Sequence, residues 1–205
     1  MAKSSKQWLR RHVTDPYVRK AREQGYRSRA AFKLLQLDEK ERLLKGGMTV
    51  VDLGAAPGGW SQLAAEKVGP AGRVVAIDLL DVAPIKGVTI LKGDFRDSIV
   101  LDALRGERAD VVLCDAAPNL SGIGLTDQAR QLELAAAAVE FCRKALKAEG
   151  VFVVKAFQGS AFDELMRTLR SVFASVRIAK PAASRGESAE TYVVARRLLA
   201  GKESA

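Results

Sequence analysis

Three segments suited to holding a small ligand follow successive apolar runs of the chain. The first is the run of small residues 54–59, whose glycines would let the backbone approach a ligand closely. Asp78 comes 24 residues after Gly54, at a distance where an acid can accept hydrogen bonds from ribose hydroxyls. Asp94 follows the next apolar run and could accept a hydrogen bond from the amino group of an adenine. Either aspartate could instead cap the helix that follows it. The dinucleotide fingerprint G-x-G-x-x-G is missing, so the pattern favours an adenosine site without a phosphate-binding loop.

A lysine and an aspartate associated with two further apolar runs suggest proton chemistry. Asp115 directly follows the run 109–114, and Lys155 lies inside the run 151–157. Burying an unpaired charge is costly, so one reading of Lys155 is a side chain that reaches solvent from the strand end. In the other reading, burial and a second cation lower its proton affinity, and the lysine acts as a general base toward a weakly acidic hydroxyl.

The composition excludes several functional classes. The cysteines are Cys114 and Cys142 and the single histidine is His12, which leaves no plausible zinc site and little prospect of a Ser-His-Asp triad. Each cysteine is expected to be a small buried apolar residue, and the absence of a disulfide framework indicates a reducing compartment, which we expect to be the cytoplasm. The longest stretch without a charge, Leu53–Ala65, has 13 residues, fewer than the roughly 20 that a membrane span needs. We also expect no signal peptide, because residues 1–11 have no apolar core.

The positive charge of the chain is concentrated near its beginning. The net charge is +9, and residues 1–45 hold 13 basic and 5 acidic side chains, whereas the remainder holds 20 and 19. Trp8, Tyr17, Tyr26 and Phe32 are interleaved with these charges, a composition that fits a phosphate backbone and exposed bases. A solvated, salt-bridged helical face and a mitochondrial transit peptide are the alternatives.

Short β-branched runs alternate with helical patterns after residue 45. The predicted strands are Met48–Leu53, Arg73–Ile77, Val88–Leu91, Ala109–Cys114, Val151–Phe157, Val176–Ala179 and Thr191–Ala195. The predicted helices are Ser28–Glu41, Trp60–Val68, Ser98–Leu104, Asp127–Ala148 and Ala161–Phe173, with Gly150 as a stop for the fourth. This alternation predicts a single α/β domain with a Rossmann-like, doubly wound, mostly parallel sheet of seven strands covered by helices on both faces. Residues 1–45 would form a basic RNA-binding extension, 46–197 the catalytic core and 198–205 a tail.

Several segments together resemble the FtsJ-type ribosomal RNA ribose 2′-O-methyltransferases. The glycine-rich segment reads VDLGAAPGGWS from Val51 to Ser61, and the matching segments elsewhere are SRAAFKL (28–34), GDFRD (93–97), DAAPN (115–119), KAFQG (155–159) and SRGESAETY (184–192). The likeness runs from about Trp8 to about Arg196. One departure is Ala31, where the family commonly has an aromatic residue before Phe32.

The resemblance implies a catalytic tetrad and a cofactor. The Lys-Asp-Lys-Glu tetrad of the family falls on Lys33, Asp115, Lys155 and Glu190, and its S-adenosylmethionine contacts fall on Gly58, Trp60, Asp78, Asp94 and Asp115. Glu190 is preferred to Glu187 because its spacing to Tyr192 matches the family, and Trp60 is the least specific match because an aromatic residue at a helix start is about as often part of the core. In the implied mechanism, Lys155 removes the proton of the 2′-hydroxyl late in the displacement, and no metal takes part.

The resemblance also implies the substrate, a uridine in the 23S RNA of the assembled large ribosomal subunit. We expect a monomer with no membrane or protein partner. A transfer RNA ribose 2′-O-methyltransferase and a non-catalytic RNA-binding protein of ribosome assembly remain as alternatives. A base amino methyltransferase is disfavoured because residues 115–118 read DAAP where that class carries Asn or Asp-Pro-Pro-aromatic. A nucleotide-linked oxidoreductase is disfavoured by the missing dinucleotide fingerprint.

Overall fold

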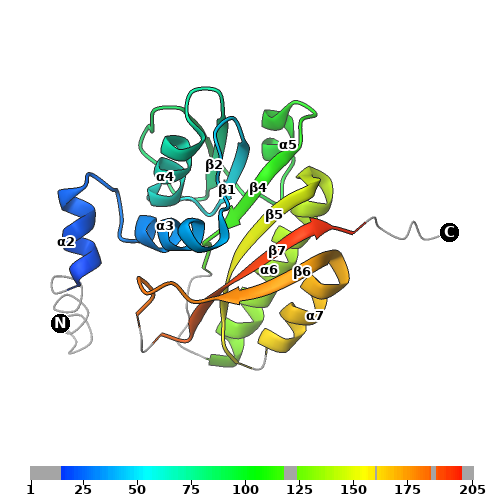
Figure 1. Ribbon diagram of the computed structural model, residues 1–205. Helices are drawn as coiled ribbons and strands as arrows, with labels where there is room; N and C mark the ends of the chain where they lie inside the picture. The colour runs from blue at the N-terminus through cyan, green and yellow to red at the C-terminus, as the bar shows by residue number, and fades with distance from the viewer. Residues whose placement is uncertain (1–14, 118–123, 160, 186–187, 200–205) are drawn as a thin grey trace.

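A seven-stranded sheet forms the centre of the protein (Figure 1). The computed structural model describes residues 15–117, 124–159, 161–185 and 188–199. The strands are β1 (Thr49–Leu53), β2 (Arg73–Asp78), β3 (Val88–Lys92), β4 (Ala109–Cys114), β5 (Leu146–Phe157), β6 (Phe173–Ala179) and β7 (Glu190–Leu198). Their order across the sheet is β3-β2-β1-β4-β5-β7-β6, so all seven predicted strands are present.

The direction of the strands places one end of the sheet in position to hold a ligand. Strands β3, β2, β1, β4 and β5 pair in parallel, and β7 inserts antiparallel between β5 and β6. The strand order reverses between β1 and β4, and ligands of open α/β sheets bind outside the carboxyl ends of the strands at such a point. The mostly parallel, doubly wound fold predicted from the sequence is confirmed.

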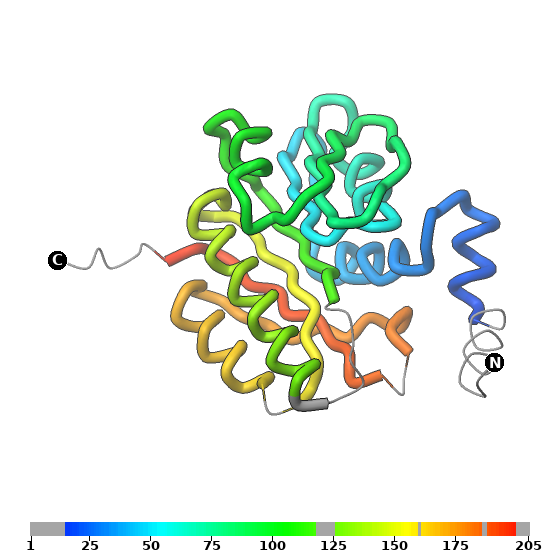
Figure 2. The backbone as a smooth tube through the Cα atoms, turned by 180° about the vertical axis from the view of Figure 1, so that it is seen from behind, coloured from blue at the N-terminus to red at the C-terminus, as the bar shows by residue number. Residues whose placement is uncertain are grey.

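Helices cover both faces of the sheet. They are α2 (Pro16–Glu23), α3 (Ala30–Glu41), α4 (Gly59–Val68), α5 (Ile99–Leu104), α6 (Gly124–Ala145) and α7 (Phe162–Val172). One apolar cluster joins α3 and α4 to one face of the sheet, and a second joins α5, α6 and α7 to the opposite face. Figure 2 views the molecule from the side opposite to Figure 1, and α6 and α7 lie in front of the sheet in this view. None of the helices in the described ranges is both long and apolar enough to cross a membrane.

The predicted boundary between the fourth helix and the fifth strand is wrong. Helix α6 ends at Ala145 instead of Ala148, and β5 begins at Leu146. Gly150 therefore lies inside the strand and does not stop the helix. A Cβ at this glycine would lie 2.6 Å from the Leu146 side chain, and the pairing of β4 with β5 shifts register nearby, between Ala109 and Val111. The glycine thus marks a local irregularity of the strand, where a backbone without a side chain allows close packing.

Two further elements differ from the sequence prediction. Strand β6 begins at Phe173, predicted as the end of the preceding helix, because Phe173 is buried against Phe152 of the sheet. Helix α2 was not predicted at all. The Asp15 side chain accepts a 3.0 Å hydrogen bond from the Tyr17 N–H, and Pro16 occupies the first turn, so the Asp-Pro pair is a helix start signal.

Candidate active site

A cavity of about 510 Å³ opens at the carboxyl ends of the parallel strands. Its walls include the segments that follow β1, β2, β3 and β4, with Gly54, Asp78, Asp94, Asp115 and Lys155 among the residues that line it. This volume lies within the range of small-molecule sites. Three of the predicted cofactor contacts, the three aspartates, therefore line a single cavity.

Gly54 is required where β1 and β4 end side by side. Its φ is +75°, and a Cβ at this position would lie 2.5 Å from the Cβ of Ala116 and 2.8 Å from its Cα. Any side chain would collide with Ala116, in the segment that follows β4. The glycine therefore allows the two strand ends to form one wall of the cavity.

Asp78 is held in place by main-chain donors. One carboxylate oxygen accepts from the Ala56 N–H at 2.9 Å, and the other accepts from the Leu80 N–H at 2.8 Å. Each oxygen of an ionised carboxylate has two acceptor positions, so one position remains on each. Two adjacent acceptors are suited to the two neighbouring hydroxyls of a ribose.

Gly58 and Trp60 lie beside the cavity but are not among its lining residues. Gly58 has a φ of +104° and is covered by Ile85, whose Cδ1 would lie 2.7 Å from an added Cβ. The Trp60 side chain is buried at 3% exposure, and its indole N–H donates to the Ala30 oxygen at 2.7 Å. The Trp60 ring also packs on Tyr192. The side chain of Trp60 is therefore part of the core and does not line the cavity.

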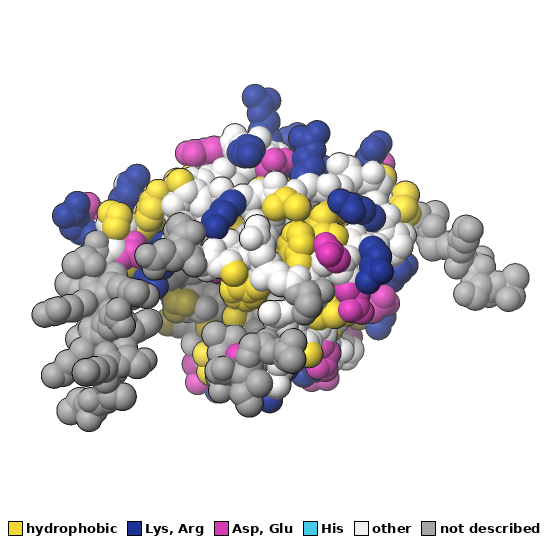
Figure 3. Space-filling model, turned by 90° about the horizontal axis from the view of Figure 1, so that it is seen from below, with side chains coloured by type: hydrophobic (Ala, Val, Ile, Leu, Met, Phe, Trp, Pro, Cys, Tyr) yellow, Lys and Arg dark blue, Asp and Glu magenta, His cyan; other side chains and the backbone are white. Residues whose placement is uncertain are grey.

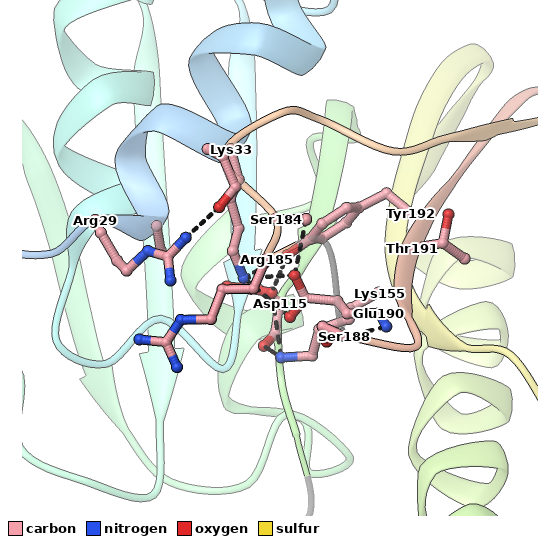
Figure 4. A network of polar contacts seen from close by, with 12 residues as sticks. Arg29, Lys33, Asp115, Lys155, Ser184, Arg185, Ser188, Glu190, Thr191 and Tyr192 are labelled. Carbon is pink, nitrogen blue, oxygen red and sulfur yellow. Dashed lines mark hydrogen bonds and ion pairs between the residues drawn. The ribbon is translucent and has the colours of Figure 1, made fainter. Parts of the chain in front are cut away.

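The four tetrad residues come together from four parts of the chain (Figure 4). Lys33 of α3 places its Nζ 2.7 Å from Glu190 Oε1 and 2.9 Å from Oε2. Lys155 of β5 places its Nζ 3.2 Å from Asp115 Oδ1 and donates to the Asp115 main-chain oxygen. Lys155 is only 6% exposed, and its ammonium group points toward Asp115 rather than toward solvent. The structure thus forms two ion pairs, Lys33–Glu190 and Lys155–Asp115.

Tyr192 connects these two ion pairs, and the sequence prediction gave it no role. Its hydroxyl accepts from Lys33 Nζ at 3.2 Å and donates to Asp115 Oδ1 at 2.7 Å. The register of β5 and β7 places Tyr192 opposite Lys155, with Glu190 opposite Phe157. The signal was present in the sequence, since a tyrosine two residues after Glu190 shares its face of the strand.

The charges around Glu190 and Tyr192 fix their protonation states. Burial by itself would raise the pKa of Glu190, but the charge of Lys33 and its hydrogen bond outweigh burial and hold that pKa below its usual range. Burial and the nearby charges of Asp115 and Glu190 raise the pKa of Tyr192 far above its usual value. Glu190 is therefore an anion and Tyr192 a neutral hydroxyl at neutral pH. Glu187, the alternative acid, lies outside the described residues.

Two arginines lie next to the tetrad. Arg29 Nη1 lies 2.6 Å from Asp15 Oδ2, and Arg185 Nη2 lies 3.3 Å from the same oxygen. Figure 4 shows both guanidinium groups on one side of the tetrad. Figure 3 shows the molecule from the side where β5 ends and α6 begins. Lys and Arg side chains are spread over this surface. Residues 1–14, including Trp8 and His12, lie outside the described part of the chain.

Comparison with known proteins shows the family to which this chain belongs. A family model described as FtsJ-like methyltransferase matches residues 26–198. The chain belongs to this family.

Relatives of this FtsJ-like methyltransferase carry a more specific name. This chain is 53% identical over 196 residues to a Nitrosospira multiformis protein named Ribosomal RNA large subunit methyltransferase E. The alignment covers 94% of this chain and 95% of the relative. A Dechloromonas aromatica protein of the same name is 50% identical, covering 96% and 98%. The crystal structure of a putative ribosomal RNA methyltransferase from Plasmodium falciparum superposes with a TM-score of 0.75 at 29% identity, covering 86% of this chain and 100% of that one.

The cavity of this FtsJ-like methyltransferase fits S-adenosylmethionine, the cofactor of the family. Asp78 offers two acceptors for a ribose, Asp94 offers a carboxylate for a base, and Gly54 leaves the backbone of the β1 end uncovered by a side chain. Within the described residues, no group of three or more His, Cys, Asp and Glu side chains could hold a metal ion. Both cysteines are buried, and burial raises the pKa of Cys114 to about 12, which disfavours a thiolate nucleophile there.

Proposed function

We propose that this methyltransferase transfers the methyl group of S-adenosylmethionine to the ribose 2′-oxygen of a uridine in the 23S RNA of the large ribosomal subunit. The observation that carries the proposal is the ion pair of the buried Lys155 with the half-buried Asp115, which lies in the wall of the candidate cofactor cavity. A lysine in this position can accept a proton from a substrate hydroxyl that reaches the same cavity. The near-full-length relatives named Ribosomal RNA large subunit methyltransferase E support the choice of substrate.

The chain's own residues divide the work between binding and proton transfer. When bound, S-adenosylmethionine supplies an electrophilic methyl group on a sulfonium. Asp78 and Asp94 would hold the nucleoside part of the cofactor through their free acceptor positions. In its neutral form, Lys155 would take the proton of the 2′-hydroxyl, and Asp115 would stabilise the resulting ammonium group.

The remaining tetrad residues would orient Lys155 and the substrate. Lys33 is held by both oxygens of Glu190 and by Tyr192, and Tyr192 in turn fixes Asp115. Alignment of the methyl group with the 2′-oxygen is the main catalytic requirement, because a correctly held pair of reactants avoids a large entropic cost. A rigid network of charged hydrogen bonds is suited to that task.

Basic side chains close to the tetrad would bind the RNA. Arg29 and Arg185 are held beside the catalytic lysines by Asp15, so phosphate contacts and the reacting ribose would lie close together. We expect RNA affinity to fall steeply with salt, because phosphate contacts release counterions. A small domain has little surface for reading sequence, so the shape of a folded target with the reactive nucleotide splayed out would supply specificity. We further propose that the protein acts as a monomer in the cytoplasm.

The substrate can be tested by labelling. The protein and radiolabelled S-adenosylmethionine would be incubated with large subunits, small subunits, naked ribosomal RNA and transfer RNA from a strain lacking the gene. We expect label in large subunits, at a 2′-O-methyluridine, and none with the Lys155→Ala variant. Label in transfer RNA but not in large subunits would favour the transfer RNA enzyme. Absence of label from all four substrates, with RNA binding retained, would favour the non-catalytic RNA-binding protein.

A further inference from the structure

Arg96 holds the carboxylate of Asp94 with both its side chain and its main chain. The Arg96 Nε lies 2.9 Å from each Asp94 oxygen, and Nη2 also donates to Oδ2. The Arg96 main-chain N–H donates to Oδ1 at 2.9 Å. Both residues line the candidate cofactor cavity, with the Asp94 side chain 23% exposed and that of Arg96 55% exposed. This contact belongs to the cavity but involves none of the tetrad residues.

The contact leaves Asp94 with one acceptor position. An ionised carboxylate has four such positions, two on each oxygen. Three N–H groups of Arg96 occupy three of these positions: the main-chain N–H donates to Oδ1, Nη2 donates to Oδ2, and the single Nε–H is shared between the two oxygens. Three hydrogens on four acceptor positions leave one position of the carboxylate for a donor in the cavity. Asp78 differs, because its two main-chain donors leave one position on each oxygen.

This difference matches the two polar parts of an adenosine. A ribose presents two neighbouring hydroxyls, which need two acceptors, whereas the 6-amino group of adenine presents an N–H to a single acceptor. The guanidinium fork of Arg96 also keeps Asp94 ionised, because its hydrogen bonds, more than any other cause, hold the pKa of Asp94 below its usual range. An ionised carboxylate accepts hydrogen bonds and donates none, so it would favour an amino group at that position.

We propose that Arg96 is a positioning residue that makes the cavity selective for adenine, by fixing the Asp94 carboxylate so that its last acceptor position takes the 6-amino group. This inference rests on the proposed function, since it requires an adenosine-containing cofactor in the cavity. Arg96 acts through Asp94 and makes no contribution to the transfer step itself. On its outer side, Arg96 Nη1 lies 3.8 Å from Glu133 of α6, an exposed pair that contributes little.

A comparison of two ligands isolates the contribution of the amino group. Binding of S-adenosylhomocysteine and of its 6-desamino analogue, in which purine replaces adenine, would be measured by calorimetry in the wild-type protein. We expect the wild type to bind S-adenosylhomocysteine about tenfold to a hundredfold more tightly, the range for a hydrogen bond to a charged group. In Arg96→Leu we expect this preference to shrink to a few-fold. In Arg96→Lys, which keeps the charge but loses the fork, we expect a similar loss.

Matched variants separate this role from general effects. Arg143→Leu removes an exposed arginine paired with Glu140 at 3.1 Å on α6, and it should leave the preference unchanged. Glu133→Gln should also leave it unchanged. Asp94→Asn should remove most of the preference, because it replaces the acceptor itself.

The outcomes distinguish failure of this inference from failure of the proposed function. Equal weakening of both ligands in Arg96→Leu, with the preference intact, would overturn the role of Arg96, as would a wild-type preference in Arg96→Lys. A larger preference in Arg96→Leu would show that Arg96 competes with the amino group, which also overturns it. Failure of the wild-type protein to bind S-adenosylhomocysteine would instead overturn the proposed function.

Discussion

The Tyr192 hydroxyl donates a 2.7 Å hydrogen bond to Asp115 Oδ1, although 77 residues separate the two in the chain. The same hydroxyl accepts a hydrogen bond from Lys33, so one fully buried tyrosine joins the Lys33–Glu190 pair to the Lys155–Asp115 pair. Because its donor direction is used by Asp115, the hydroxyl can only accept from Lys33. The relative positions of Lys33 and Lys155 therefore depend on this side chain.

Tyr192→Phe should slow methyl transfer while leaving cofactor binding within about twofold of the wild type. Loss of hydrogen bonds to two charged groups corresponds to a reduction of about tenfold to a hundredfold in the single-turnover rate. Tyr17→Phe is the matched control, since the Tyr17 hydroxyl accepts a 3.2 Å hydrogen bond from Gln36 away from the tetrad. A wild-type rate in Tyr192→Phe would show that the two ion pairs are positioned independently.

Lys155→Ala should abolish detectable methyl transfer and leave the affinity for S-adenosylmethionine nearly unchanged. The reason is that the lysine acts on the RNA hydroxyl, whereas the acceptors for the nucleoside part of the cofactor are on other strands. Lys147→Ala is the control on the same strand, because Lys147 forms a 2.6 Å ion pair with Asp110 on the surface. Single-turnover kinetics with saturating RNA would check the rate. Retention of more than a small fraction of activity would falsify the assignment of Lys155 as the base.

Patterns of residue type were sufficient to predict the sheet but not the tetrad. The buried parallel strands are nearly continuous apolar runs, and the acids that follow them meet at one edge because parallel strands end together. The tetrad required the resemblance to a family, since no spacing in the chain predicts that Lys33 of α3 meets Glu190 of β7.

Features that depend on local packing were not predictable in the same way. Glycine is a residue type that often ends a helix, but the position of Gly150 inside β5 depends on the register with β4 and on contact with Leu146. The position of Trp60 directly after a glycine turn predicts contact with a ligand. Its side chain is instead held in the core by the Ala30 carbonyl and the Tyr192 ring. The link between Arg96 and Asp94 depends on side-chain conformation, on which the sequence pattern carries no information.

Asp15→Ala should detach helix α2 from the catalytic core. The carboxylate of Asp15 caps α2, accepts from Arg29 and Arg185, and is only 7% exposed. Loss of a helix cap and of a buried ion pair should lower the free energy of unfolding by about 2–4 kcal/mol, as measured by urea denaturation. Glu23→Ala is the control on the same helix, because its pair with Arg19 is exposed and should contribute less than about 0.5 kcal/mol. Equal stability of the two variants would contradict the prediction that Asp15 stabilises the fold through its helix cap and its ion pairs with Arg29 and Arg185.

Asp52 of β1 gives the protein a measurable dependence on pH. It is fully buried, and burial, together with the charges of Asp115 and Asp78, raises its pKa to about 7. The folded protein therefore keeps this proton between about pH 4 and pH 7, whereas an unfolded aspartate releases it near pH 4. Because the unfolded state binds fewer protons in this window, the free energy of unfolding should fall as the pH rises, by up to about 1.4 kcal/mol per pH unit.

Asp52→Asn replaces the titrating carboxyl group with an amide and should remove its contribution to the pH dependence of the free energy of unfolding. The difference in free energy of unfolding, variant minus wild type, should rise from about pH 4 to about pH 7 and then level off, as measured by urea denaturation without cofactor. Ser61→Ala provides the opposite test. The Ser61 hydroxyl donates to Asp52 Oδ2 and lowers its pKa, so its removal should extend the decline in stability above pH 7. A pH-independent difference for Asp52→Asn would mean that Asp52 is ionised throughout. In that case an unidentified group would have to stabilise its charge, because the Oδ1 atom has no hydrogen-bond partner within the described residues.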